Sequence, residues 1–307
     1  MRPYNRVVNG NRRQYKMIAI DLDGTLLSPS GEVSPRSKAA VHKALSAGLL
    51  VCFATGRNWT ESRTVIDAVE HYGSAVFAGG AMVIDTGRRV TLHRMMMDPR
   101  LARELCAHFE GQGHAVLALQ DTETAGVDYL VTGEAALNEA TVQWMAITHA
   151  KIQRVPRLSD YDHGHTIRVG IVAAREAVEH SKRTLVDTFG DRIVQHGLYV
   201  PAYGVEVLEV FDPAVNKWQG ILHVAARHGI GPEDIVAIGD DINDLPMLAG
   251  AGLGVAMGNG RPEAKAVADV VIGTNAEDGL AQFIEGLVEQ HAVEPLSQVE
   301  ADSRPRV

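Results

Sequence analysis

Several features that mark particular classes of protein are scarce or missing in this sequence of 307 residues. No apolar run approaches the roughly 20 residues of a membrane helix, and the arginine-rich start lacks the apolar segment that completes a secretory signal. The formal net charge of −9 argues against the basic face that nucleic-acid binding needs. The two cysteines are Cys52 and Cys106, and Cys52 lies in an apolar segment where a buried thiol is expected rather than a disulfide. We therefore expect a cytoplasmic protein with neither a membrane nor a nucleic-acid partner.

Short apolar runs alternate with helical patterns at both ends of the chain. Hydrophobic residues make up 46% of the sequence and charged residues 22%, as is usual for a globular protein. Unbroken apolar runs are typical of strands buried on both faces, and Ser34-Pro35 has the form of a helix start. This alternation predicts an α/β fold with a doubly wound, Rossmann-like parallel sheet. The strands expected in this sheet are 17–20, 49–54, 75–78, 235–238, 252–256 and 270–272.

The middle of the chain has a different pattern. A hairpin is expected over 81–94, and the strands that follow alternate apolar with polar residues, which favours an antiparallel sheet with helices on one side. The module's expected strands are 114–119, 127–132, 166–173 and 205–210. We therefore predict a parallel-sheet core of residues 16–86 and 213–290, an α+β module inserted at 87–212, and loose termini at 1–15 and 291–307.

Acidic residues follow two of the predicted strands. Asp21 comes directly after the first strand, and Asp23 and Gly24 follow it; Asp240 lies just beyond the strand 235–238. Because the carboxyl ends of parallel strands share one edge of a sheet, we expect these acids to face a common crevice. A hard cation such as Mg²⁺ would relieve the repulsion between them. The plainer alternative for Asp21 and Asp23 is a solvated acidic turn.

Residues suited to phosphate binding are predicted at the same edge. Thr55 follows the strand 49–54, Lys217 opens a helix, and the backbone N–H groups of Gly24 and Thr25 add anion-binding donors. Together with the acids, they indicate a phosphoryl-transfer site with a carboxylate nucleophile. Taken singly, Lys217 would be a solvated helix residue and 240–244 an acidic helix start. The loop 162–165 holds two histidines without acidic or thiol partners nearby, so we interpret it as a solvated loop rather than a metal site.

Four motifs together resemble the haloacid dehalogenase (HAD) superfamily, and within it the Cof-type phosphatases with a large α/β cap. These motifs are Asp21-Leu-Asp-Gly-Thr, Ala54-Thr-Gly-Arg57, Asn216-Lys217 and Gly239-Asp-Asp-Ile-Asn-Asp244. They lie in both predicted core segments, whereas the inserted module corresponds to the cap in position and size only. Gly79 departs from the pattern, because this branch usually carries Asn there.

The resemblance implies a role for each residue of these motifs. Asp21 is expected to attack phosphorus, while Asp23 protonates the leaving group and then activates water. Asp21, the backbone carbonyl of Asp23 and Asp240 are expected to bind Mg²⁺, with Asp244 in a supporting role. The residues expected to bind phosphate or substrate are Gly24, Thr55, Gly56, Arg57, Lys217 and Asn243.

These roles predict a Mg²⁺-dependent phosphatase that hydrolyses a small phosphomonoester, such as a sugar phosphate, through an aspartyl-phosphate intermediate. The cap would select the substrate. One alternative is a phosphotransferase or phosphomutase with the same intermediate; another is a catalytically weak protein that binds a phosphorylated ligand. Asp23 argues against the second alternative, because a binding protein needs no general acid. The sequence identifies neither the substrate nor the oligomeric state.

Overall fold

The computed structural model describes residues 7–8, 11–12, 14–133, 136–200 and 204–292. The chain forms two compact units, each taken by itself below. The first unit comprises Met1–Thr55, Thr64–Val76 and Lys217–Val307, and the second comprises Gly56–Arg63 and Phe77–Asn216. In the part of the chain that is described, no helix is both long and apolar enough to cross a membrane.

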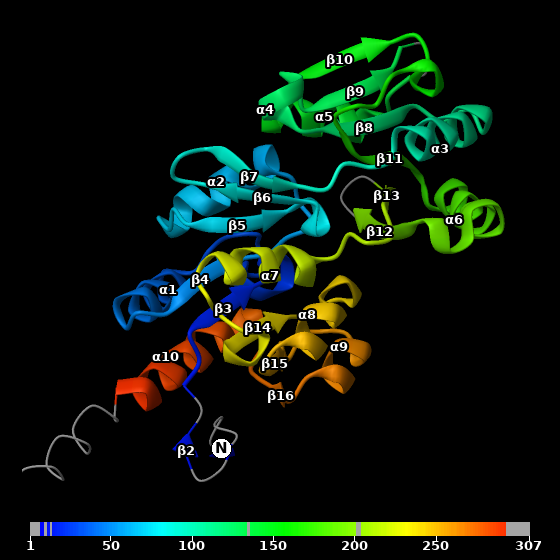
Figure 1. Cartoon of the computed structure of the whole chain (residues 1–307). Helices are drawn as coiled ribbons and strands as arrows, with labels where there is room; N and C mark the ends of the chain where they lie inside the picture. Colours follow the sequence, from blue (N-terminus) through cyan, green and yellow to red (C-terminus); the bar gives the residue numbers. More distant parts are fainter. Residues whose placement is uncertain (1–6, 9–10, 13, 134–135, 201–203, 293–307) are drawn as a thin grey trace, which may run out of the picture. The chain divides into compact units, whose positions relative to one another are not determined.

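The first unit is built on a five-stranded sheet in which every pairing is parallel, as predicted (Figure 1). The strand order is β16-β15-β14-β3-β4. All four residues of the central strand β3 are fully buried, which explains why its sequence is an unbroken apolar run. Because the strands are parallel, β3, β4 and β14 end at the same edge of the sheet. The bounds are β3 (Met17–Ile20), β4 (Leu50–Phe53), β14 (Ile235–Gly239), β15 (Leu253–Ala256) and β16 (Val270–Val271).

Helices connect the strands of this sheet, in keeping with the predicted alternation of strands and helices. The first begins as expected: the side chain of Ser34 accepts a hydrogen bond from the backbone N–H of Ser37 at 3.0 Å, and Pro35 is the first helical residue. This helix packs against the last one, and Arg36 and Glu285 form an ion pair between them at 2.8 Å. The helices are α1 (Pro35–Ser46), α7 (Lys217–Arg227), α8 (Leu245–Gly250), α9 (Pro262–Val267) and α10 (Gly279–Ala292). A further helix, α2 (Trp59–Val69), begins in the second unit and ends in the first.

The expected strand 75–78 forms, but not as a full member of the parallel sheet. β5 (Ser74–Phe77) meets the end of β4 at a single bridge, Ala54 to Val76. It then heads a separate three-stranded sheet of order β5-β6-β7. The other two strands, β6 (Met82–Asp85) and β7 (Val90–Arg94), are the antiparallel hairpin predicted over 81–94. β5 differs from the prediction because it meets β4 at only one residue and belongs to the sheet of the hairpin instead.

The second unit contains a six-stranded sheet of order β10-β9-β8-β11-β13-β12 (Figure 1). Its pairings are antiparallel as predicted, except that β9 and β10 run parallel. The four predicted strands are present, whereas β10 and β12 were not predicted. The bounds are β8 (Val116–Gln120), β9 (Tyr129–Thr132), β10 (Ile152–Val155), β11 (Thr166–Ala174), β12 (Val194–Val200) and β13 (Val205–Phe211).

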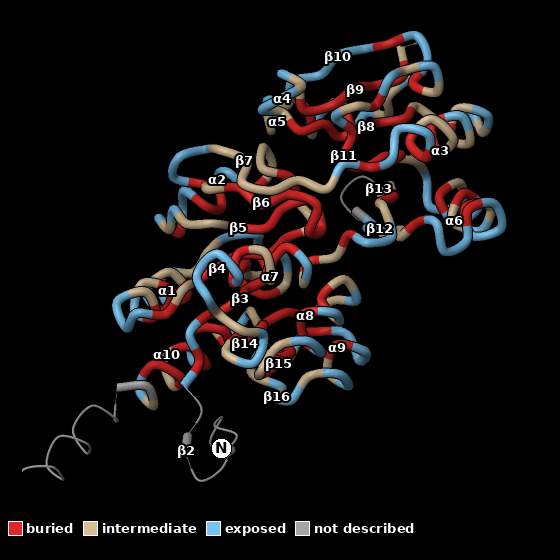
Figure 2. The backbone as a smooth tube through the Cα atoms, in the orientation of Figure 1, coloured by how far each residue is buried: buried red, intermediate tan, exposed pale blue. Residues whose placement is uncertain are grey.

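One face of this sheet is covered by two helices, α3 (Pro99–Gly111) and α6 (Arg175–Phe189). Their apolar side chains form a single buried cluster with those of the sheet, including Leu105, Leu185, Val169 and Leu208. The strands β8, β9 and β11 are buried along most of their length (Figure 2). The shorter helices of this unit are α4 (Thr122–Ala125) and α5 (Glu139–Thr148).

The expected loose leader contains one short strand pairing, and the expectation that the loop 162–165 is solvated holds for Asp162 and His165 but is wrong for His163. In the predicted loose leader, β1 (Val7–Val8) pairs antiparallel with β2 (Asn11–Arg12), and Tyr15 is buried. In the loop 162–165, His163 is fully buried, and its ring nitrogens bond to the carbonyl of Leu158 and the hydroxyl of Thr166. Residues 1–6, 9–10 and 13 of the leader and the tail 293–307 lie outside the described residues.

Candidate active site

Asp21 stands at the carboxyl end of the central strand of the parallel sheet. Its backbone N–H donates to the carbonyl of Ile238 on β14 at 3.0 Å, so the β3–β14 pairing continues up to this residue. The Asp21 side chain is almost fully buried, and its Oδ1 accepts a hydrogen bond from Lys217 Nζ at 2.6 Å. The strand thus holds a buried carboxylate at the sheet edge, in contact with a buried ammonium group.

A wide turn, Leu22–Leu26, follows Asp21 and carries the next predicted site residues. Within it Asp23 and Gly24 leave helical geometry, and Gly24 has a φ of +78°. A Cβ atom on Gly24 would lie only 2.2 Å from Oδ2 of Asp240, so a side chain there would collide with that carboxylate. Thr25 donates from Oγ1 to the other oxygen of Asp240, Oδ1, at 3.1 Å. The glycine is therefore required both by its backbone conformation and by the close approach of Asp240.

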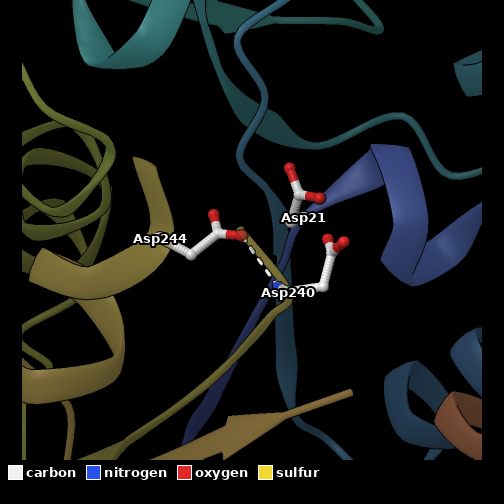
Figure 3. Close-up of side chains that lie close together, drawn as sticks. All are labelled: Asp21, Asp240 and Asp244. Carbon is white, nitrogen blue, oxygen red and sulfur yellow. Dashed lines mark hydrogen bonds between the residues drawn. The ribbon is translucent and has the colours of Figure 1, made fainter. Parts of the chain in front are cut away.

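Asp244 is completely buried and forms hydrogen bonds through both carboxylate oxygens, and Figure 3 shows the one that it accepts from the backbone of Asp240. Oδ1 accepts from Lys217 Nζ at 2.7 Å. Oδ2 accepts from the backbone N–H groups of Asp240 and Asp241 at 2.9 and 3.0 Å. Asp244 therefore fixes the backbone turn that follows β14, and with it the direction in which the Asp240 side chain points.

Lys217 is the first residue of α7 and links the two buried carboxylates. Its Nζ donates to Asp21, to Asp244 and, at 3.2 Å, to Oδ1 of Asn243. Burial alone would lower the pKa of this ammonium group, but the neighbouring carboxylates of Asp21 and Asp244 outweigh it and raise the pKa above the ordinary value. Lys217 therefore stays a cation, which is the charge state that phosphate binding would require.

The three carboxylates at this edge carry more charge than Lys217 can neutralise. Oxygens of Asp21, Asp240 and Asp244 lie within 4.8 Å of one another (Figure 3). Burial raises the pKa of Asp21 well above its usual range; Lys217 opposes the rise, and the other two acids add to it. Burial, with the charge of Asp244, also raises the pKa of Asp240 to about 6. One further cation would let Asp21 and Asp240 remain ionised.

The donor set fits a magnesium ion. Carboxylate oxygens are the protein ligands that Mg²⁺ prefers. Both oxygens of Asp244 are already engaged by hydrogen bonds, whereas the contacts described above use only Oδ1 of Asp21 and Oδ1 of Asp240. Asp21 and Asp240 are therefore the better pair of side-chain ligands, and Asp244 is better suited to orienting Asp240 and Lys217.

The remaining predicted residues occupy different places. Thr55 is fully buried at the end of β4, and its backbone N–H donates a hydrogen bond to the carbonyl of Val76 at 2.9 Å. The side chain of Asp23 is exposed on the wide turn. Gly56 and Arg57 belong to the second unit.

One contact at the site was not anticipated from the sequence. Asn259 donates from Nδ2 to the backbone carbonyl of Gly24 at 2.8 Å and so helps to hold the wide turn. Asn259 ends the stretch Gly254-Val-Ala-Met-Gly-Asn259, which resembles this branch of the family. That resemblance was the available signal, but it gave Asn259 no role.

The comparisons with known proteins agree with one another, because all of them find hydrolases or phosphatases. A family model described as haloacid dehalogenase-like hydrolase matches residues 18–284. A 5-amino-6-(5-phospho-D-ribitylamino)uracil phosphatase of Bacillus subtilis is 28% identical over 297 residues, covering 89% of this chain and 98% of that protein. A pyridoxal phosphate phosphatase of Escherichia coli is 28% identical, covering 88% of this chain and 97% of that protein. The crystal structure of a haloacid dehalogenase-like hydrolase from Bacteroides thetaiotaomicron has a similar fold, with a TM-score of 0.73 at 22% identity, covering 89% of this chain and 99% of that one.

Proposed function

Because this chain belongs to the haloacid dehalogenase-like hydrolases, we propose that it is a phosphatase that uses Asp21 as a covalent nucleophile and requires Mg²⁺. One observation carries the proposal: the buried Asp21 carboxylate is held at 2.6 Å by Lys217, at a strand end that it shares with Asp240. In the proposed roles Asp21 is the nucleophile, Lys217 binds phosphate and Asp240 is a metal ligand, and the closeness of these side chains at one sheet edge supports the proposal.

In the first step an oxygen of Asp21 forms a bond to the substrate phosphorus, and the ester P–O bond breaks. Asp23, whose exposed side chain lies two residues later, gives its proton to the departing alkoxide. Lys217, Thr55 and Asn243 bind the phosphate oxygens during this transfer. The products of this step are an alcohol and an aspartyl-phosphate on Asp21.

In the second step the Asp23 carboxylate takes a proton from a water molecule whose oxygen forms a bond to phosphorus. The bond between Asp21 and phosphorus breaks, so inorganic phosphate leaves and Asp21 is again a carboxylate. Asp23 ends the cycle protonated, ready for the next leaving group. Burial of Asp21 protects the intermediate, because bulk water reaches it poorly.

Asp21, Asp240 and the backbone carbonyl of Asp23 would hold Mg²⁺, which when bound would offset the negative charge of the phosphate and the acids. Asp244 contributes by holding the N–H groups of Asp240 and Asp241, and by sharing Lys217 with Asp21. Gly24 contributes by leaving room for the Asp240 carboxylate. Each supporting contact thus acts on the orientation of a residue that touches the substrate or the ion.

The substrate class that we propose is a small phosphorylated metabolite. The two similar phosphatases above are named for a phosphoribityl-aminouracil and for pyridoxal phosphate, both of which are small phosphate monoesters. The core site described here recognises phosphate and metal, so the leaving group must be recognised elsewhere. We propose that the inserted module of residues 87–212 supplies that recognition.

The test measures phosphate release from an activated aryl phosphate and from a panel of metabolite phosphates that includes both compounds. Release should require Mg²⁺, stop with EDTA, and be lost in Asp21→Asn. Asp240→Asn should lose Mg²⁺ activation, whereas Asp241→Asn is the matched control, because the Asp241 side chain caps Ile242 and pairs with Arg261 instead. Activity that survives EDTA or the Asp21 substitution would refute the proposal. Transfer of phosphate to an added sugar in place of water would instead favour a phosphotransferase.

A further inference from the structure

The six-stranded sheet of the second unit carries charged and polar side chains on the face opposite its two helices. Val169 and Ile171 of β11 pack into the apolar cluster of α3 and α6, so the alternate residues Arg168 and Gly170 point to the other face. Glu209 of β13 pairs with Gly170 and therefore shares that face. Yet Arg168 is only 5% exposed, so something other than the helices must cover it.

Register across three strands brings a tyrosine to the same place. Leu119 of β8 pairs with Arg168 of β11 on one side and with Tyr129 of β9 on the other. Residues paired across neighbouring strands share a face, so Tyr129 and Arg168 flank Leu119 in one row. Their long side chains meet, with Arg168 Nη2 donating to the Tyr129 hydroxyl at 3.2 Å.

The guanidinium group of Arg168 contacts four partners in this unit. It forms an ion pair with Glu209 at 2.7 Å and lies 5.7 Å from the centre of the Phe211 ring. Besides the tyrosine, it donates from Nη1 to the backbone carbonyl of Gly56 at 3.0 Å. Gly56 is far away in the sequence and lies in the motif that links Thr55 to Arg57.

Residues 56–61 are therefore held to this face by more than one bond. Asn58 donates from Nδ2 to the Tyr129 hydroxyl at 2.9 Å. Thr60 donates to Oδ1 of the buried Asp128 at 2.8 Å. Asn58 and Glu61 also cap each other, each backbone N–H donating to the other's side chain at 2.9 Å. This segment belongs to the same compact unit as the sheet, although it lies more than a hundred residues before Arg168.

We propose that Arg168 is a positioning residue that fixes the backbone of Gly56 and Arg57 for substrate binding. The proposal rests on the phosphatase function proposed above and on the expectation, from the resemblance of the motif Ala54-Thr-Gly-Arg57, that Gly56 and Arg57 bind the substrate. Arg168 touches neither phosphate nor metal ligand in this role; it acts through the Gly56 carbonyl. A guanidinium suits the task, because its planar fork holds the Glu209 carboxylate, the tyrosine and the carbonyl together, whereas the single ammonium of a lysine cannot reach all of them.

The experiment compares Arg168→Lys with Arg154→Lys. Arg154 also lies on this sheet and also donates to backbone carbonyls, those of Thr132 and Gly133, but it does not contact residues 56–61. Steady-state kinetics on an aryl phosphate and amide hydrogen exchange of residues 57–62 are measured on both full-length proteins. Losing a charge-assisted hydrogen bond that positions a ground-state contact should raise KM about tenfold or more and change kcat much less. Amide hydrogen exchange of residues 57–62 should become faster in Arg168→Lys and should stay unchanged in Arg154→Lys.

A second, milder variant guards against misfolding. Tyr129→Phe removes only the hydroxyl between Arg168 and Asn58, and should move KM and exchange in the same direction by a smaller amount. Native KM and native exchange in both variants would overturn the proposal. So would a uniform loss of stability and of kcat with no local change in exchange, which would indicate a purely structural role. The exchange measurement needs no turnover, so it still tests the contact if the wild-type protein proves not to be a phosphatase.

Discussion

A single methyl group added at Gly24 should disturb the proposed metal site while the protein stays folded. Gly24→Ala places a Cβ atom 2.2 Å from Oδ2 of Asp240, far inside van der Waals contact. The Asp240 carboxylate is the part that can give way, since the neighbouring backbone is held by Asp244 and Asn259. Moving it breaks the 3.1 Å hydrogen bond from Thr25. We therefore expect a folded protein whose Asp240 points in the wrong direction.

The cost in stability can be isolated with Gly31→Ala. Gly31 has a φ of +79°, nearly that of Gly24, and no described atom lies within 4 Å of its would-be Cβ. Both variants should therefore lose the roughly 1–2 kcal/mol that a left-handed conformation costs an L-residue. Gly24→Ala alone should also weaken Mg²⁺ activation, by about 10- to 100-fold, as is typical when the orientation of a metal ligand is lost.

The assay is a Mg²⁺ titration of aryl phosphate hydrolysis, with chemical denaturation of each variant in parallel. The expected result is that the two variants have similar free energies of unfolding, while only Gly24→Ala shows a raised Mg²⁺ midpoint. A Gly24→Ala enzyme with a native midpoint and native kcat/KM would refute the reasoning. It would mean that Asp240 is not a metal ligand, or that the turn moves without consequence.

Three further outcomes are expected. Asp23→Asn should accumulate phosphorylated Asp21 with an activated aryl phosphate, because attack persists while water lacks its base; mass spectrometry that finds no adduct would contradict this. Burial raises the pKa of Glu209 from 4.5 to about 7, so the folded state favours the protonated side chain. The contribution of this group to the free energy of unfolding, at most about 3 kcal/mol, is complete below pH 4.5 and is lost as the pH rises through 7. The Tm of the wild type should therefore fall relative to that of Glu209→Gln between pH 5 and 8. Parallel curves of Tm against pH for the two proteins would contradict this prediction. Burial also raises the pKa of the Cys106 thiol, and that of Cys52 to about 12, so Ellman's reagent at pH 8 should label native protein far more slowly than protein in urea.

The sequence was informative about the parallel sheet because that sheet's signals are local. Four consecutive apolar residues in β3 require burial on both faces, and such strands occur in parallel sheets. Once the sheet is parallel, the placement of Asp21, Thr55 and Asp240 at one edge follows from the direction of the strands. The prediction that these residues follow strands ending at one sheet edge is confirmed, and the order β14-β3-β4 further shows that the three strands are neighbours. Their chemical roles remain proposals.

Edge strands and long-range polar contacts were harder to predict. β10 and β12 lie at the two ends of the six-stranded sheet, and three of the four residues of β10 are exposed, so no alternating pattern marks it. The buried His163 is satisfied by partners that only the folded chain brings near. The same holds for Arg168 and Gly56, which lie 112 positions apart. Local patterns cannot indicate such partners, because the residues meet only after the sheet has formed.

Asp240 and Asp244 show why closeness of carboxylates does not by itself define a metal site. They lie four positions apart on one turn, and both have oxygens within 4.8 Å of Asp21. Asp244 accepts three hydrogen bonds, one from a lysine and two from backbone N–H groups, so a cation would have to compete for either of its oxygens. Asp240 accepts one, from Thr25, and stands partly exposed beside a residue with no side chain. The donors around each acid, more than the distance between the acids, thus support the proposal that Asp244 holds the site in place and that Asp240 binds the ion.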